Sequence, residues 1–179
     1  LPHNTNLMEE IGRFIGSVSK TLKRFSHPAM HRNMFWDLKH GLELVQTYLV
    51  EIANPEKEDK VGILIELIEK TLAPIKDNLR EQVIYNDAND HNLLVQCDHS
   101  GIGKIIGAID VGDSLYSWLA AEPAVACAYA MLNKKNPLKT ARNIIGAYHK
   151  IYPLSEKEIS ALFSLTALRV CMSVTISAY

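Results

Sequence analysis

Two short segments of the sequence decide the fold: Tyr85-Asn86-Asp87-Ala88-Asn89-Asp90-His91-Asn92 and Ile109-Asp110-Val111-Gly112-Asp113. The first segment places amides, carboxylates and a histidine between two apolar runs. A segment built only for core packing would not carry this composition, and polar loops on a rigid body are where catalytic residues concentrate. The alternative interpretation is a polar loop that is capped by its own side chains.

The residues around these segments favour a small β region. Three short apolar or β-branched runs lie at residues 82–86, 93–96 and 104–109. The turn-rich stretch between the last two, residues 98–103, predicts a hairpin. In such a hairpin the strand that ends at Asp110 pairs with the strand that follows Asn92. We therefore expect the side chains of Asp87, Asn92 and Asp110 to converge.

The rest of the chain has the apolar spacing of helices. The predicted helices cover about residues 6–25, 34–52, 56–79, 120–132, 137–149 and a last stretch from residue 155. Ser155 and Glu158 fit a capping box at the start of the last helix. We predict one mainly α domain over residues 1–179, with a β insert at 82–113 that carries the two polar segments.

Length and composition are those of one ordinary globular domain. The chain has 179 residues, of which 47% are apolar and 22% charged, and a formal net charge of −1. This charge gives no reason to expect a nucleic-acid or membrane-surface partner. No uninterrupted apolar run approaches the roughly 18 residues of a membrane span. We expect no signal peptide, because no basic stretch leads into an apolar core near the start.

The three cysteines, Cys97, Cys127 and Cys171, lie far apart in the sequence. We interpret them as buried, reduced thiols of a cytoplasmic protein, because they cannot all pair and no CxxC motif indicates a zinc site. The chain starts with Leu1 instead of an initiator methionine and stops at Tyr179 within a helical pattern. We expect both ends to be points of excision from a longer protein.

The three converging side chains suit one kind of chemistry. Two carboxylates and an amide offer hard oxygen atoms, which suit Mg²⁺ better than a soft metal. Phosphoryl transfer needs such a set. One carboxylate accepts or orients the proton of the attacking hydroxyl, while an amide and a carboxylate hold the metal on the nucleotide phosphates.

The order of these motifs resembles a known family. A D-x-x-x-x-N element, an apolar strand, a hairpin and I-D-x-G are similar to the catalytic and metal-binding loops of protein-kinase-like enzymes. The surrounding residues resemble the aminoglycoside/choline/homoserine phosphotransferase family, most of all its hydroxylysine-kinase-like branch, whose members are sometimes fused to class III aminotransferase domains. The segment from Glu122 to Leu132 also resembles the helix that follows the metal loop in that branch.

The resemblance implies roles for single residues. Asp87 corresponds to the catalytic base, and Asn92 and Asp110 correspond to the Mg²⁺ ligands. Asp113 reaches the metal or the substrate, or else it caps the next turn. Asn89 contacts the substrate, or else it shapes the loop. The resemblance also implies ATP or GTP as the phosphoryl donor and a hydroxyl group of a small, cationic amine or amino acid as the acceptor.

The sequence departs from the family pattern at two positions. The family usually has a histidine two residues before the catalytic aspartate, where this chain has Tyr85. We expect Tyr85 to support the loop in its place. Val111 replaces an aromatic residue after the metal-binding aspartate. Trp36-Asp37 resembles a further feature of the branch, either a core tryptophan with an Asp-capped turn or a wall of the substrate cleft.

The resemblance covers only half of a kinase. Nothing in the sequence corresponds to an N-terminal lobe with its Gly-rich loop and Lys–Glu pair. We therefore interpret the chain as the C-terminal lobe, nearly inactive alone, whose partners are its own N-lobe and a fused aminotransferase domain where the parent has one. Two alternatives remain: a non-catalytic, pseudokinase-like docking module of a larger protein, and a helical regulatory domain with a chance motif.

Overall fold

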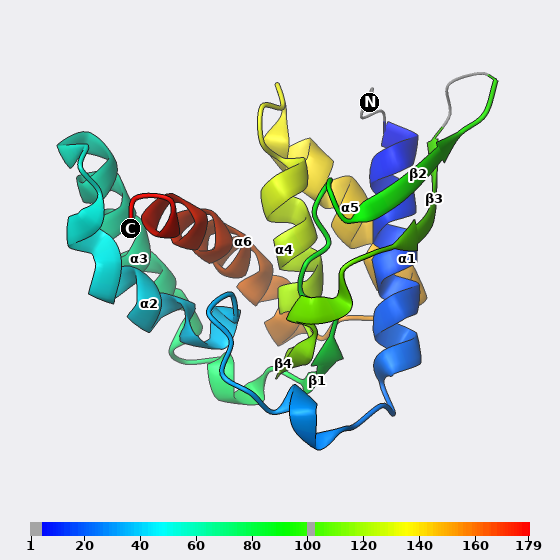
Figure 1. Cartoon of the computed structure of the whole chain (residues 1–179), viewed down its shortest axis with the longest axis horizontal. Coiled ribbons are helices and arrows are strands. Elements are labelled where there is room, and N and C mark those ends of the chain that lie inside the picture. Colours follow the sequence, from blue (N-terminus) through cyan, green and yellow to red (C-terminus); the bar gives the residue numbers. More distant parts are fainter. Residues whose placement is uncertain (1–4, 100–102) are drawn as a thin grey trace.

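The helices form two groups in the computed structural model, which describes residues 5–99 and 103–179, and the small β region lies beside one of them (Figure 1). One group contains α1 (Thr5–Leu22), α4 (Ala121–Ala130) and α5 (Pro137–Ile151), and the other contains α2 (Gly41–Tyr48), α3 (Pro55–Leu72) and α6 (Glu156–Ile176). The strands are β1 (Glu81–Ile84), β2 (Leu93–Cys97), β3 (Gly103–Ala108) and β4 (Leu115–Trp118). The predicted class, mainly α with a small β region, is confirmed. Residues 100–102 of the predicted turn and the first four residues lie outside the described part.

Capping decides where the second helical region begins. Asp37 accepts a hydrogen bond from Lys39 N and starts a 3₁₀ turn at Leu38–His40. The single helix predicted over residues 34–52 is therefore wrong. In its place, α2 spans eight residues between two 3₁₀ turns.

Two other helices, α3 and α6, start close to where the sequence predicts. Asn54 accepts a hydrogen bond from Lys57 N and caps α3, although this helix ends at Leu72 instead of near residue 79. The capping box of α6 is confirmed, because the Ser155 side chain accepts from Glu158 N and the Glu158 side chain accepts from Ser155 N.

The predicted hairpin is present, with β2 and β3 antiparallel and Leu93 opposite Ala108. The expected β insert ends at residue 113, but residues 115–118 form a further strand, β4, which pairs with β1. The four residues of β4 show no clear alternation of apolar and polar side chains, so their sequence does not indicate a strand. In the β1–β4 pair Ile84 lies opposite Leu115. The two polar segments therefore border the same end of this small sheet.

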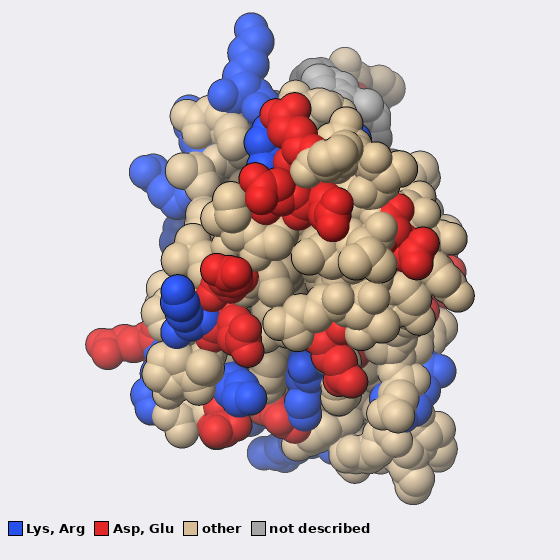
Figure 2. All heavy atoms as spheres, turned by 90° about the vertical axis from the view of Figure 1, so that its left-hand side faces the viewer, with Lys and Arg blue, Asp and Glu red and all other residues tan. Residues whose placement is uncertain are grey.

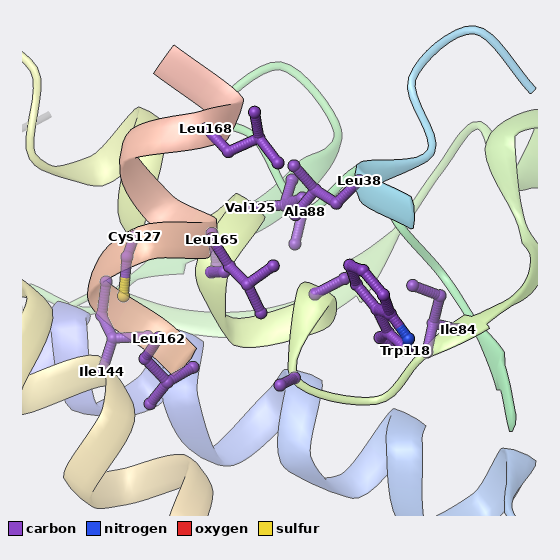
Figure 3. Close-up of a cluster of buried hydrophobic side chains, with 14 of the residues drawn as sticks. Leu38, Ile84, Ala88, Trp118, Val125, Cys127, Ile144, Leu162, Leu165 and Leu168 are labelled. Carbon is purple, nitrogen blue, oxygen red and sulfur yellow. The ribbon is translucent and has the colours of Figure 1, made fainter. Parts of the chain in front are cut away.

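A large part of the buried core comes from α4 and α6. Figure 3 shows side chains of both helices in one cluster, including Val125, Cys127, Leu162, Leu165 and Leu168. The loop residue Ala88 belongs to the same cluster, so core packing also anchors the polar loop. By length and composition α6 could cross a membrane, but 56% of its apolar stretch is buried inside the protein, which is what a core helix also shows.

The three cysteines are free thiols in different surroundings. Cys127 and Cys171 are buried as predicted, and burial raises the pKa of Cys127 to about 12. Cys97 is exposed, so its predicted burial is wrong: it is the last residue of β2, at the end of the hairpin strand. On the molecular face shown in Figure 2, acidic and basic side chains are intermixed and separated by neutral areas.

α1 and α5 approach so closely that Gly12 has no room for a side chain. A Cβ atom at this position would lie 2.2 Å from the carbonyl oxygen of Ile144 and 2.8 Å from the Cβ of Ala147. Both neighbours belong to α5, and the nearer atom is backbone. The close approach of the two helices therefore depends on this glycine.

We expect Gly12→Ala to lower the free energy of unfolding by more than about 2 kcal/mol, because the Ile144 carbonyl can move only with α5. Gly146→Ala is the matched control, since a Cβ atom at Gly146 would meet nothing within 4 Å. The control should stabilise the protein by about 0.5–1 kcal/mol through helix propensity. Equilibrium unfolding in urea measures both changes, and equal effects of the two substitutions would contradict the prediction.

Candidate active site

A buried carboxyl group binds the backbone at the start of the first polar segment. One carboxylate oxygen of Glu122, in α4, accepts hydrogen bonds from the backbone N–H groups of Tyr85 at 2.6 Å and Asn86 at 3.2 Å. The Glu122 side chain is inaccessible to solvent. Asn86 has a left-handed φ of 66°, which asparagine tolerates better than most residues. These bonds fix the backbone immediately before Asp87.

The Asp87 carboxylate is held by two amides of its own loop. Oδ1 accepts from Asn89 Nδ2 at 2.9 Å, and Oδ2 accepts from Asn92 Nδ2 at 2.5 Å. Asn89 Oδ1 in turn accepts from the backbone N–H groups of His91 and Asn92. In this structure Asn89 therefore shapes the loop, and it does so while holding Asp87.

The second polar segment lies beside Asn92. Ile109 N donates to the carbonyl oxygen of Asn92 at 2.9 Å, and the hydroxyl of Tyr85 donates to the carbonyl oxygen of Ile109. Asp110 has a left-handed φ of 54°, and its Oδ1 accepts from Gly112 N. A Cβ atom at position 112 would lie 3.0 Å from that oxygen. The absence of a side chain at Gly112 therefore makes room for the Asp110 carboxylate.

The structure brings the predicted residues together to different degrees. Asp87, Asn89 and Asn92 share hydrogen bonds, whereas the Asp110 side chain bonds to its own turn and, among the described residues, makes no hydrogen bond to Asp87 or Asn92. The convergence of Asp110 with Asn92 is seen in the backbone. Burial and then the charges of Asp87 and Asp110 raise the pKa of Asp113. These three carboxylates therefore share one electrostatic environment.

Two hard oxygen atoms have the chemistry that Mg²⁺ requires. Asn92 uses its amide nitrogen on Asp87, and Asp110 uses Oδ1 on Gly112. Asn92 Oδ1 and Asp110 Oδ2 accept no hydrogen bond from the described chain. No three His, Cys, Asp or Glu side chains of residues 5–99 and 103–179 gather into a metal site by themselves. Mg²⁺ is usually held by one or two protein ligands with phosphate oxygens and water, so the pair fits this ion.

A buried arginine beside Asp87 is missing from the set predicted by the sequence. Arg169 Nη2, in α6, lies 3.6 Å from Asp87 Oδ1. Nη1 donates to the carbonyl oxygen of Trp36 at 2.9 Å, and Nη2 donates to the hydroxyl of Tyr129 at 3.2 Å. The guanidinium carbon lies 4.4 Å from the centroid of the Trp36 ring and 5.6 Å from that of Tyr129. The available signal was a lone charge in an otherwise apolar stretch of helix.

A cavity of about 530 Å³ lies next to Tyr129, which also binds Arg169. It opens between α4, α6 and the start of α3, and its lining includes Tyr129, Lys57 and Ser173. Tyr129 therefore contacts both the cavity and Arg169. The cavity lining contains no carboxylate. The acidic groups of the region lie on the two polar segments instead.

Comparison with known proteins gives one family. The sequence model of the phosphotransferase enzyme family (APH) matches residues 2–156. The hydroxylysine kinases of Bos taurus and Mus musculus are each 30% identical to the chain, over 187 and 178 residues. These matches cover 100% and 95% of this chain but only 50% and 47% of the two relatives. The chain thus spans about half the length of the curated relatives it matches.

A solved structure has the same fold. The amicoumacin kinase hAmiN, in complex with AMP-PNP, Ca²⁺ and Ami, aligns with a TM-score of 0.66 at 15% sequence identity. The alignment covers 98% of this chain and 52% of that kinase. At this identity the likeness concerns the fold alone.

Glu122 makes the stability of the protein depend on pH. Burial, opposed by the backbone hydrogen bonds from Asn86 and Tyr85, raises its pKa from an ordinary 4.5 to about 7. Between these two values the folded protein keeps a proton that the unfolded chain releases. This contribution to stability is present below pH 4.5 and is lost as the pH rises towards 7.

We expect Glu122→Gln to remove this pH dependence, because the amide keeps a hydrogen-bond acceptor and does not titrate. The difference in unfolding free energy between wild type and variant should change between pH 4.5 and 7 with a slope of up to about 1.4 kcal/mol per pH unit, in favour of the variant at higher pH. Urea unfolding at several pH values measures it. A constant difference across this range would refute the assignment.

Proposed function

The chain belongs to the phosphotransferase enzyme family, as its two motifs predicted, and we propose that it is the catalytic C-terminal lobe of a small-molecule kinase. The reaction is transfer of the γ-phosphoryl group of ATP or GTP to a hydroxyl group of a small amine or amino acid. The observation that carries this proposal is the Asp87 carboxylate, held by Asn89 and Asn92 next to the segment that contains Asp110.

Asp87 serves as the base in this proposal. Each of its oxygens accepts a single loop hydrogen bond and, as a carboxylate oxygen, has capacity for one more. The acceptor hydroxyl binds at this free capacity and gives its proton to Asp87 as its oxygen attacks the γ-phosphorus. The bond to the nucleoside diphosphate breaks, and the diphosphate leaves. A base contributes to such a step by orientation as well as by proton transfer.

Asn92 and Asp110 would hold Mg²⁺ in this proposal. Their free oxygens lie on segments joined by the hydrogen bond from Ile109 N to Asn92 O. When bound, the ion supplies positive charge against the nucleotide phosphates. Burial and the charges of Asp87 and Asp110 raise the pKa of Asp113, so it lies in the same acidic environment. In this proposal Asp113 is not one of the two Mg²⁺ ligands, and its charge acts on them from nearby.

We propose that the outer face of the hairpin meets the nucleotide and an N-terminal lobe. Leu94 and Ile106 in the hairpin, and Ile109 directly after it, expose 42%, 57% and 48% of their surface. Exposed apolar side chains of this size on one short segment are what a partner is expected to cover. The half-length match to the curated relatives supports a second lobe as this partner. A fused aminotransferase domain and a cytoplasmic location stay predictions.

Hydroxylysine is the first acceptor to test, because the curated relatives are hydroxylysine kinases. The carboxylates of Asp87, Asp110 and Asp113 favour a cationic acceptor by charge complementarity. Full-length protein, Mg²⁺ and either ATP or GTP should phosphorylate hydroxylysine, homoserine or an aminoglycoside. Product formation is followed by mass spectrometry. Absence of turnover with every acceptor would favour the non-catalytic docking module.

Replacing the base tests its role directly. In the full-length protein we expect Asp87→Asn to lower kcat by about 100-fold or more, because the amide has nearly the same shape but cannot accept the proton. Asp90→Asn is the matched control, since Asp90 is an exposed carboxylate of the same loop. The control should keep kcat within about twofold of the wild type. Equal activities of the two variants would rule out Asp87 as the base.

The metal role of Asp110 predicts a different defect. Asp110→Asn should raise the Mg²⁺ concentration for half-maximal activity by about 10-fold or more, because a charged ligand is replaced by a neutral one. Asparagine tolerates the left-handed φ of this residue, so the backbone is expected to stay in place. Activity is titrated with Mg²⁺ at saturating nucleotide. A lower kcat with an unchanged Mg²⁺ requirement would contradict this role.

A further inference from the structure

Arg169 is a permanent cation in the protein interior. It is 1% exposed, and Asp87 is the one carboxylate within ion-pair distance among the described residues. A buried guanidinium cannot discard its proton to avoid the cost of burial. An arginine at this depth therefore depends on the charge of Asp87 and on hydrogen bonds from its surroundings.

Stability alone does not explain this pair. Buried ion pairs are often no more stabilising than apolar side chains of similar volume, because removing both charges from water costs as much as their attraction returns. The guanidinium also keeps one buried nitrogen, Nε, without a hydrogen bond to the described chain. A leucine or methionine at this helical position would pack without these costs. The contact with Asp87 is thus the feature that distinguishes arginine here.

Three elements fix the position of the guanidinium. It extends from α6, donates to the carbonyl oxygen of Trp36 before α2, and donates to the hydroxyl of Tyr129 in α4. Its carbon lies near the rings of the same two residues, at 4.4 Å and 5.6 Å from their centroids. Cation–π contacts and hydrogen bonds together leave it little freedom. The cation therefore presents a fixed charge to the loop.

The distance to Asp87 has a specific consequence. At 3.6 Å, Arg169 Nη2 is within ion-pair range of Asp87 Oδ1 but beyond a normal hydrogen bond. The arginine attracts the carboxylate by charge and does not occupy the lone pairs that Asn89 and an acceptor hydroxyl would use. The positive charge of Arg169 also offsets the repulsion between Asp87 and the other carboxylates of the site, because it acts on Asp113 as well.

We propose that Arg169 is a positioning residue, which holds the Asp87 carboxylate in the orientation that receives the acceptor proton. This inference rests on the proposed function of Asp87. Asn89 and Asn92 hold the carboxylate from within its loop, and Arg169 holds it from the helical core. Through Tyr129, the same arginine connects the base to the wall of the cavity between α4 and α6.

Steady-state kinetics of the full-length protein tests the role with Arg169→Met and Arg169→Lys. Loss of orientation should lower kcat by about 10-fold or more for methionine and less for lysine, while the acceptor KM stays within about threefold. Arg142→Met, at an exposed arginine of α5, is the matched control and should keep wild-type kcat. Tyr129→Phe removes only one hydrogen bond of Arg169 and should lower kcat by a few-fold. If Arg169→Met does not fold, Tyr129→Phe and Arg169→Lys together test whether Arg169 positions Asp87.

A double-mutant cycle separates positioning from general damage. In the Asp87→Asn background, Arg169→Lys should lower kcat by less than about twofold, because the group that it orients no longer acts as a base. A full additional loss in that background, or wild-type kcat in folded Arg169→Lys and Tyr129→Phe, would overturn the inference. If Asp87→Asn itself keeps wild-type turnover, the proposed function fails and this inference fails with it. If Asp87→Asn lowers turnover strongly and the Arg169 variants do not, only the inference is rejected.

Discussion

Two backbone hydrogen bonds to the buried Glu122 carboxylate position everything that follows in the site. They hold Tyr85 and Asn86 where the chain leaves β1, directly before Asp87. A carboxylate without access to water is costly unless hydrogen bonds compensate it. α4 carries this group within a helix that is otherwise made mostly of small and apolar residues. A helix buried as deeply as α4 can place a carboxylate beneath the loop, so the loop is fixed from the interior and its outer side stays open to ligands.

The site also contains conformations that folded chains generally avoid. Among the described non-glycine residues, Asn86, Asp110 and Asn133 have a positive φ, and the first two lie in the site. The side-chain amide of Asn86 is buried without a hydrogen bond to the described chain. Departures of this kind cost on the order of 1–3 kcal/mol each and persist where the surroundings over-determine them. At Asn86 the bonds to Glu122 and the packing of Ala88 in the core do so. Such a concentration is expected at a functional site.

The parts of the site that could be predicted from the sequence are local. Asp87, Asn92 and Asp110 lie within one loop and one hairpin, so the order of polar and apolar residues was enough to place them on adjacent segments. The helix start at Ser155 was predictable for the same reason, since a cap acts within one turn. β4 is defined by its pairing with β1, and Arg169 reaches Asp87 from the far end of the chain. A lone charge in an apolar helix indicates that some partner exists, but it does not indicate which one.

A buried carboxyl group and a buried guanidinium hold the loop from two helices. Glu122 in α4 binds the backbone before Asp87, and Arg169 in α6 faces the Asp87 side chain. Because these helices pack on each other in the core, the distance between the two groups is set by apolar packing and not by the loop. This arrangement accounts for Tyr85 at a position where the family usually has histidine. Glu122 binds the backbone N–H of residue 85, which every residue except proline offers, and the tyrosine hydroxyl joins the loop to Ile109. The exchange of side chain therefore leaves the position of Asp87 determined by the same two helices.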